Sequence, residues 1–109
     1  MNVQWRQRSR PEAAALPAGI VRLSEAQRGD RGVVLSVSPD ALTGAGAEER
    51  EELERRLLEI GFVEGAHVEI LHEGFIGRDP IAVRLDDMRV ALRRREAQGV
   101  LMTLDDPAR

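Results

Sequence analysis

The spacing of the apolar residues changes period part-way along the chain, and this change marks the predicted elements. Over residues 47–60 the apolar side chains Leu53, Leu57 and Ile60 recur at i, i+4 and i+7, which is the period of one helical face. Four glutamates in the first turns favour the N-terminal end of a helix, and Gly61 suits a left-handed cap at the other end. The pattern therefore predicts one helix at about 47–60, whose narrow apolar stripe covers one edge of a core.

Beyond Gly65 the apolar residues alternate with polar ones, and this period of two is typical of strands with one buried face. The segments between them contain Gly, Pro or paired Asp residues, so we expect consecutive antiparallel strands joined by tight turns. A single helical turn is expected at 94–97, ended by Gly99. Together with an earlier run of valines, the chain carries five predicted strands, at 31–37, 67–71, 81–85, 90–92 and 100–104.

The predicted strand at 31–37 has apolar residues on both faces. By alternation, we expect Val33, Leu35 and Val37 to face the core. Val34 is expected on the opposite face.

Five short strands with tight connections and one helix predict a mainly β protein, a small five-stranded and partly open barrel of SH3-like type. A chain of 109 residues allows one domain with one modest core. Residues 1–19 lack a sustained period and are expected to form a flexible N-terminal extension. The barrel domain is expected over 20–105, opening with a short turn that Ser24 caps, and 106–109 are expected to form a C-terminal tail.

The apolar positions that share these periods are expected to form the core and to carry no functional signal. They are Val33, Leu35, Leu53, Leu57, Ile60, Val68, Ile70, Ile81, Val83, Leu85, Val90, Leu92, Val100 and Met102. Replacing Leu57 or Val83 with Asp is therefore expected to unfold the domain rather than to remove a site.

The composition narrows the functional classes. The net charge of −3, from 19 acidic residues against 16 arginines and no lysine, does not favour a nucleic-acid partner, because phosphate neutralisation needs a basic excess on one face. The absence of cysteine excludes a disulfide framework and suits a reducing compartment. The chain shows no run of about 18 apolar residues and no export signal. We therefore expect a cytoplasmic protein that does not insert into a membrane.

Several of these features stand in the order that one known family shows. They are Leu23, Gly29, the run from Arg56-Leu57 through Gly61-Phe62 to Gly65, Asp79-Pro80 followed by Ile81-Ala82-Val83, and Val90-Ala91-Leu92-Arg93 followed by Glu96-Ala97. Over about residues 20–104 the chain resembles the FeoA domain. The N-terminal extension and the loop and acidic helix at 38–54 are longer than in the usual pattern, and partner choice can differ at each.

The resemblance implies a small, cytoplasmic, SH3-like barrel that serves bacterial ferrous iron uptake. It also implies a partner, the FeoB-type membrane transporter of ferrous iron, whose cytoplasmic part carries a GTP-binding domain. It implies no catalytic residues and no required cofactor. The sequence itself contains no recognisable hydrolase or phosphate-binding motif. We therefore expect a non-enzymatic accessory protein that docks on the cytoplasmic part of the transporter.

His67, Glu69 and His72 are weak candidates for a metal site, because Fe²⁺ and Zn²⁺ accept imidazole and carboxylate ligands. His67 and Glu69 project to one face of their predicted strand, whereas His72 falls on the other face unless the strand ends or bulges. Two facing side chains are too few for a structural site, so the principal interpretation is a solvated strand face. The alternative function is a small carrier or sensor that binds Fe²⁺ or Zn²⁺.

Two groups of residues are candidates for a partner-binding surface. Arg93 and Arg94, in a run of three arginines, form a positive patch suited to an acidic or phosphate-bearing surface. Pairing within the chain is the alternative interpretation. Phe75 and Ile76 occupy a predicted hairpin loop near Arg78, where two large apolar groups are hard to bury together. The alternative there is that one ring closes the end of the barrel.

Overall fold

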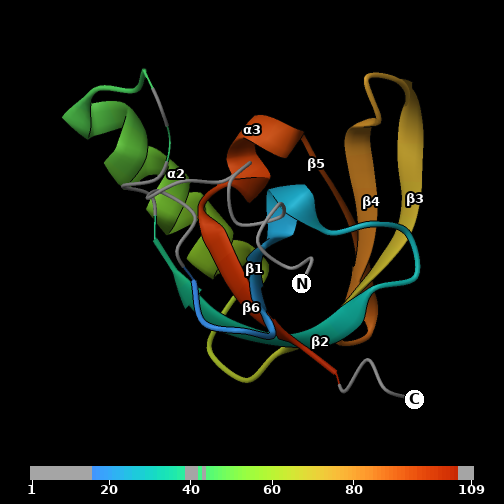
Figure 1. Cartoon of the computed structure of the whole chain (residues 1–109). Helices are drawn as coiled ribbons and strands as arrows, with labels where there is room; N and C mark the ends of the chain where they lie inside the picture. Colours follow the sequence, from blue (N-terminus) through green and yellow to red (C-terminus); the bar gives the residue numbers. More distant parts are fainter. Residues whose placement is uncertain (1–15, 39–41, 43, 106–109) are drawn as a thin grey trace, which may run out of the picture.

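The computed structural model describes residues 16–38, 42 and 44–105. These residues form one sheet of six antiparallel strands, in the order β1-β6-β2-β3-β4-β5, with one main helix beside it (Figure 1). Along the chain the elements are β1 (Ile20–Arg22), the 3₁₀ helix η2 (Leu23–Glu25), β2 (Arg31–Val37), α2 (Ala47–Ile60), β3 (His67–Ile76), β4 (Asp79–Leu85), β5 (Met88–Leu92), α3 (Arg94–Ala97) and β6 (Val100–Leu104). β1 and β5 are the two edge strands, so the curved sheet forms a barrel that does not close.

The fold class predicted from the sequence is confirmed, with one strand more than expected. The additional strand is β1, which pairs antiparallel with residues 101–103 of β6. Three residues are too few for an alternating pattern to be recognised in the sequence. The predicted N-terminal extension falls outside the described residues up to position 15, and the predicted tail falls outside them entirely, so both stay predictions.

The assignment of β2 residues to the core was wrong, since Val33 and Leu35 were expected inside the core and Val34 outside it. Val34 is 1% exposed, whereas Val33 is only partly buried and Leu35 is 36% exposed. Val37 packs against the core as expected, because a register shift between Val34 and Ser36 resets the alternation. Both faces of β2 carry apolar residues, so a period of two does not decide which face is buried.

The core is a single cluster of apolar side chains from the sheet, from α2 and from the connecting segments. Its buried members are Leu23, Ala26, Val34, Leu42, Leu53, Leu57, Phe62, Ala66, Val68, Ile70, Ile81, Val83, Leu85, Leu92, Ala97, Val100 and Met102. No helix in the described part of the chain is long and apolar enough to span a membrane.

The end of α2 carries the cap that the sequence predicts. Gly61 has a φ of 127°, a conformation that glycine adopts without steric cost. Its N–H donates to the carbonyl oxygens of Leu57 and Leu58 at 3.2 and 3.1 Å, and the Phe62 N–H donates to that of Leu57 at 3.0 Å. These bonds satisfy the last helical carbonyls and turn the Phe62 ring into the core, where it is completely buried.

The short turn near the start of the domain is not capped by Ser24, which corrects the prediction. η2 begins at Leu23 and its N-cap position is Arg22, with no side-chain capping bond. Ser24 therefore lies inside the turn. Leu23, the first residue of the turn, is completely buried.

Leu57→Ala should destabilise the domain strongly, because it removes a completely buried side chain and leaves a cavity. We expect the free energy of unfolding to fall by about 2–5 kcal/mol, measured by urea denaturation. The neighbouring Leu58 is 44% exposed, and Leu58→Ala is the matched control, with an expected fall below about 1 kcal/mol. Equal effects at both positions would contradict the packing described above.

Gly32→Ala should also destabilise the domain, because a Cβ at Gly32 would lie 1.8 Å from the Thr103 carbonyl oxygen. The two paired strands must separate to admit the methyl group, so we expect a loss of about 1–3 kcal/mol or more in the free energy of unfolding. Gly46→Ala is the control, since a Cβ there meets no atom within 4 Å. A thermal melt of Gly32→Ala that matches the wild type would refute the close approach of β2 and β6.

Candidate functional site

A β-bulge in β3 decides which face of the sheet His72 occupies. Ile70 lies opposite Val83 of β4, which is completely buried, whereas His72 lies opposite Ala82, the residue adjacent to Val83. Two residues of β3 therefore advance against one of β4, and His72 moves to the outer face, which Glu69 already occupies. His67 and His72 are both exposed. All three candidate metal ligands thus lie on the outer face. The sequence analysis expected His72 on the other face unless the strand ended or bulged, and the strand does bulge.

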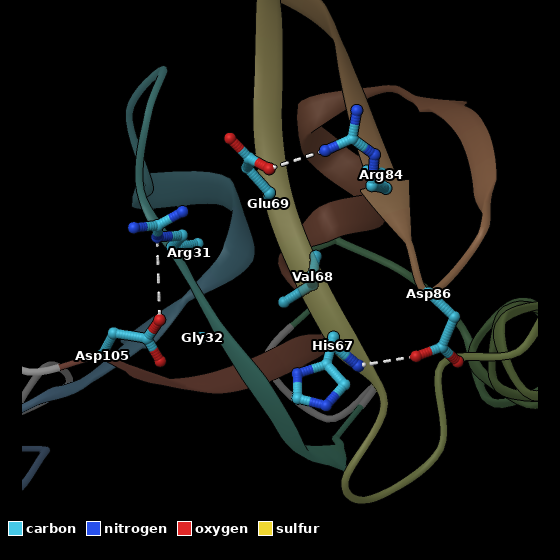
Figure 2. A pocket seen from close by; sticks show the side chains of 8 residues that line it. All are labelled: Arg31, Gly32, His67, Val68, Glu69, Arg84, Asp86 and Asp105. Carbon is cyan, nitrogen blue, oxygen red and sulfur yellow. Dashed lines mark hydrogen bonds and ion pairs between the residues drawn. The ribbon is translucent and has the colours of Figure 1, made fainter.

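A depression of about 110 Å³ on this outer face contains His67 and Glu69 but not His72. Figure 2 shows its lining residues, which are Arg31, Gly32, His67, Val68, Glu69, Arg84, Asp86 and Asp105. They come from β2, β3, β4 and the residues directly after β4 and β6. The depression thus gathers charged groups of both signs from segments that are far apart in the sequence.

Most of these charges have partners within the chain. An Arg84 guanidinium nitrogen donates to Glu69 Oε1 at 2.9 Å, and Arg31 Nε lies 3.8 Å from Asp105 Oδ2 (Figure 2). The Arg31, Asp105 and Arg84 side chains are exposed and that of Glu69 is partly exposed, so each pair contributes little to stability. Because each pair joins opposite charges, the depression carries little net charge.

The histidines and carboxylates of this face do not assemble into a metal site. Within the described part of the chain, no group of three or more His, Cys, Asp or Glu side chains is placed to hold a metal ion. Asp86 instead holds the end of β4 against the start of β3, because its Oδ1 accepts the His67 N–H at 3.0 Å and its N–H donates to the His67 carbonyl oxygen at 2.8 Å. The donors as arranged do not fit a bound Fe²⁺ or Zn²⁺.

Arg94 turns inward and joins several segments at one end of the barrel. Its side chain is 16% exposed, its Nε donates to the Arg78 carbonyl oxygen at 2.7 Å, and Nη1 donates to the Ser24 carbonyl oxygen. Its Nη2 lies 3.5 Å from Glu73 Oε2, an atom that also accepts the Arg28 N–H at 3.1 Å. Arg94 therefore links α3 to η2, to β3 and to the turn after β3.

The other two arginines of the run lie outside this cluster. Arg95 donates to Glu49 of α2 at 2.7 Å, and Arg56 of α2 donates to Glu96 of α3, so two ion pairs connect the helices. Arg93 is exposed, and its backbone N–H donates to Glu96. The alternative interpretation of the run, pairing within the chain, thus applies to Arg94 and Arg95.

Of the predicted partner-binding residues near the β3–β4 turn, the structure describes the side chain of Arg78 but not those of Phe75 and Ile76. Arg78 is exposed in the turn between β3 and β4, with a φ of 60° and its Nε 3.6 Å from Glu73 Oε1. It therefore meets Arg94 through Glu73. Phe75 and Ile76 lie at the end of β3, and their side chains are outside the described part of the structure. Partner binding by these residues stays a prediction.

Two features escaped the sequence analysis. Glu73 lies opposite Ile81, which is completely buried, so this carboxylate is on the inner side of the sheet. Only knowledge of the bulge would have revealed that. Leu58, Val63 and Met88 are large apolar side chains that are 44%, 48% and 47% exposed. The sequence did contain a signal for Leu58, because this residue falls outside the apolar stripe of the helix.

Comparison with known proteins identifies the family. The sequence model of the FeoA domain matches residues 21–104, from β1 to β6. The chain belongs to the FeoA domain family. The resemblance drawn from the sequence is thereby confirmed.

One curated relative joins a FeoA protein to a transporter. The chain is 33% identical over 84 residues to the Fe(2+) transport protein A/Fe(2+) transporter FeoB fusion protein of Porphyromonas gingivalis (strain ATCC BAA-308 / W83). The alignment covers 77% of this chain and 9% of that protein. This FeoA domain protein thus spans less than a tenth of the length of the fusion.

Two solved FeoA structures are similar over most of their length. FeoA of Stenotrophomonas maltophilia, solved in complex with zinc and described as a procaryotic SH3 domain protein, is 35% identical with a TM-score of 0.58, covering 78% of this chain and 89% of that one. FeoA of Chlorobium tepidum, solved in solution by NMR, is 34% identical with a TM-score of 0.58, covering 80% and 75%. Both agree with the SH3-like fold class.

Arg94→Lys should destabilise this FeoA domain, because lysine keeps the charge but loses the planar fork that reaches two carbonyl groups. We expect the free energy of unfolding to fall by about 1–3 kcal/mol, measured by urea denaturation. Arg89→Lys is the matched control, since Arg89 is exposed and has no ion pair among the described residues. If both variants unfold at the wild-type urea concentration, the inward guanidinium has no structural role.

Proposed function

We propose that this FeoA domain is a non-catalytic accessory protein of ferrous iron uptake that docks on the cytoplasmic part of a FeoB-type transporter. The observation that carries the proposal is the Porphyromonas gingivalis relative, in which a FeoA segment and a FeoB transporter form one chain. A covalent link keeps two parts at a high effective concentration, which serves parts that act on one another. The proposal extends this association to the present FeoA domain, as a direct contact with the cytoplasmic part of the transporter.

Docking changes transport only if the domain binds one state of the transporter more tightly than another. A ligand shifts an equilibrium by its difference in affinity between the two states, and coupling of this kind typically amounts to about 5- to 150-fold. The states that the proposal pairs are the GDP and GTP forms of the transporter's cytoplasmic part. The FeoA domain would act there in the cytoplasm, without nucleic acid and without insertion into the membrane.

A metal carrier or sensor is the second candidate function, and two observations favour it. The Stenotrophomonas maltophilia relative was solved with zinc, and the bulge in β3 places His72 on the same face as His67 and Glu69. Against it, these side chains form no metal-holding group in the described part of the chain. Docking is therefore the principal proposal.

Direct binding tests the two candidates together. The full chain is titrated with the cytoplasmic part of the FeoB protein of the same organism, loaded with GDP or with a GTP analogue, by isothermal calorimetry. We expect saturable binding whose affinity differs between the nucleotides. His67→Ala/His72→Ala should bind the transporter as the wild type does, because the proposal assigns the histidines no part in docking.

Ferrous iron is titrated separately to address the carrier. Stoichiometric iron binding that His67→Ala/His72→Ala abolishes, together with no binding to FeoB in either nucleotide state, would replace docking with metal carriage.

A further inference from the structure

Three residues with exposed apolar side chains, Leu58, Val63 and Met88, lie close to Gly61 at the end of α2. Gly61 lies between them, because its N–H bonds the Leu58 carbonyl oxygen at 3.1 Å and its own carbonyl oxygen accepts the Val63 N–H at 2.8 Å. On the other side, Met88 Cε lies 3.8 Å from the position that a Cβ on Gly61 would take. We call Leu58, Gly61, Val63 and Met88 the α2-end patch. Exposed apolar side chains that gather in this way mark an interaction surface more often than single ones do.

Each apolar side chain of this patch is next in the chain to an acidic residue. These residues are Glu59, Glu64 and Asp87, and all three are exposed. None of these three forms an ion pair with another described residue. Arginine partners are present for Glu49, Glu52, Glu69, Glu73 and Glu96, whereas Glu48, Glu51 and Glu54 of α2 also form no ion pair with another described residue. The patch therefore combines an apolar centre with neighbouring carboxylates, the acidic rim, which form no ion pair within the described part of the chain.

Met88 and Arg89 belong to different faces of β5, so the nearby arginine does not neutralise the rim. Met88 lies opposite Leu85, which is buried, and Arg89 lies opposite Arg84 on the outer face. Successive side chains of a strand point to opposite faces. Met88 accordingly emerges where the inner face of the sheet meets the end of α2.

The elements that present the patch are fixed by bonds within the domain. Two ion pairs connect α2 to α3, and the Gly61 cap fixes the chain as it leaves the helix. The turn before Met88 is held by the two bonds between Asp86 and His67. A surface held in place before binding loses less conformational entropy when a partner arrives.

The negative charge of the rim indicates which kind of partner would bind the patch. A second copy of this chain would set carboxylates against carboxylates, and an anionic lipid surface would repel them in the same way. A protein surface with apolar side chains surrounded by Lys or Arg complements both the centre and the rim.

We infer that the α2-end patch is the surface through which this FeoA domain docks on a basic, partly apolar surface of the transporter's cytoplasmic part. The inference rests on the proposed function, because it names the contact surface for that docking. The apolar centre would supply most of the affinity, and the rim would raise the association rate and set the orientation.

The test measures the affinity of the full chain for the cytoplasmic part of FeoB at low and at high salt. Leu58→Asp/Val63→Asp should weaken binding by about tenfold or more, because carboxylates replace the apolar centre. Glu59→Gln/Glu64→Gln should weaken binding mainly at low salt and reduce its salt dependence. Both pairs of positions are exposed, so thermal melts near that of the wild type are expected.

Ala91→Asp is the matched control, because it adds a carboxylate at an exposed position of β5, on the outer face opposite Ala82. It should bind as the wild type does. If the double Asp variant fails to fold, Leu58→Ala/Val63→Ala removes the same apolar groups without adding charge and is measured instead.

The possible results separate the inference from the proposed function. Wild-type affinity in folded patch variants would overturn the inference and leave docking standing. Failure of the wild type to bind in either nucleotide state would overturn both. Self-association that the patch variants abolish without any change in transporter binding would assign the patch to a second copy of the chain, and the inference would be wrong.

Discussion

The burial of Leu57 and Phe62 at the end of α2 is the contact on which the rest of the structure depends. Both side chains are completely buried, and an open sheet with two free edges needs such a contribution to complete its core. The fit is close, because a Cβ on Gly99 would lie 3.3 Å from Leu57 Cδ1. The helix therefore rests almost directly on the backbone between α3 and β6. Through this contact the core fixes the direction of α2, and with it the position of Leu58, Gly61 and Val63 at the surface.

Polar side chains lie on both faces of the sheet, and the bulge in β3 changes which residues of this strand face outward. Before the bulge, Glu69 faces outward and pairs with Arg84. After it, His72 faces outward while Glu73 turns to the inner side and meets Arg94. Charges in both places are satisfied within the domain. The surface at the end of α2 differs, because it exposes apolar groups next to carboxylates that pair with no other described residue.

A small barrel of this type is a scaffold, and its fold alone does not specify what it does. The functional proposal therefore draws on the relative that joins FeoA to a transporter in one chain. The structure adds a condition on how such docking would change the transporter. If the domain docks as proposed, it would change the transporter only by preferring one of its states, and a preformed patch would bind such a state with little ordering cost.

The sequence by itself determined the local elements and the family. The helix at Ala47–Ile60, its Gly61 cap and the strand at Arg31–Val37 follow from spacing and residue type, because these preferences act between near neighbours in the chain. Only the tertiary structure decided the inner face of β2, the pairing of β1 with β6, the side on which His72 lies and the partners of the arginine run. Each of these depends on register and contact between strands and helices far apart in the sequence, and a one-dimensional pattern does not encode which distant segment will lie opposite.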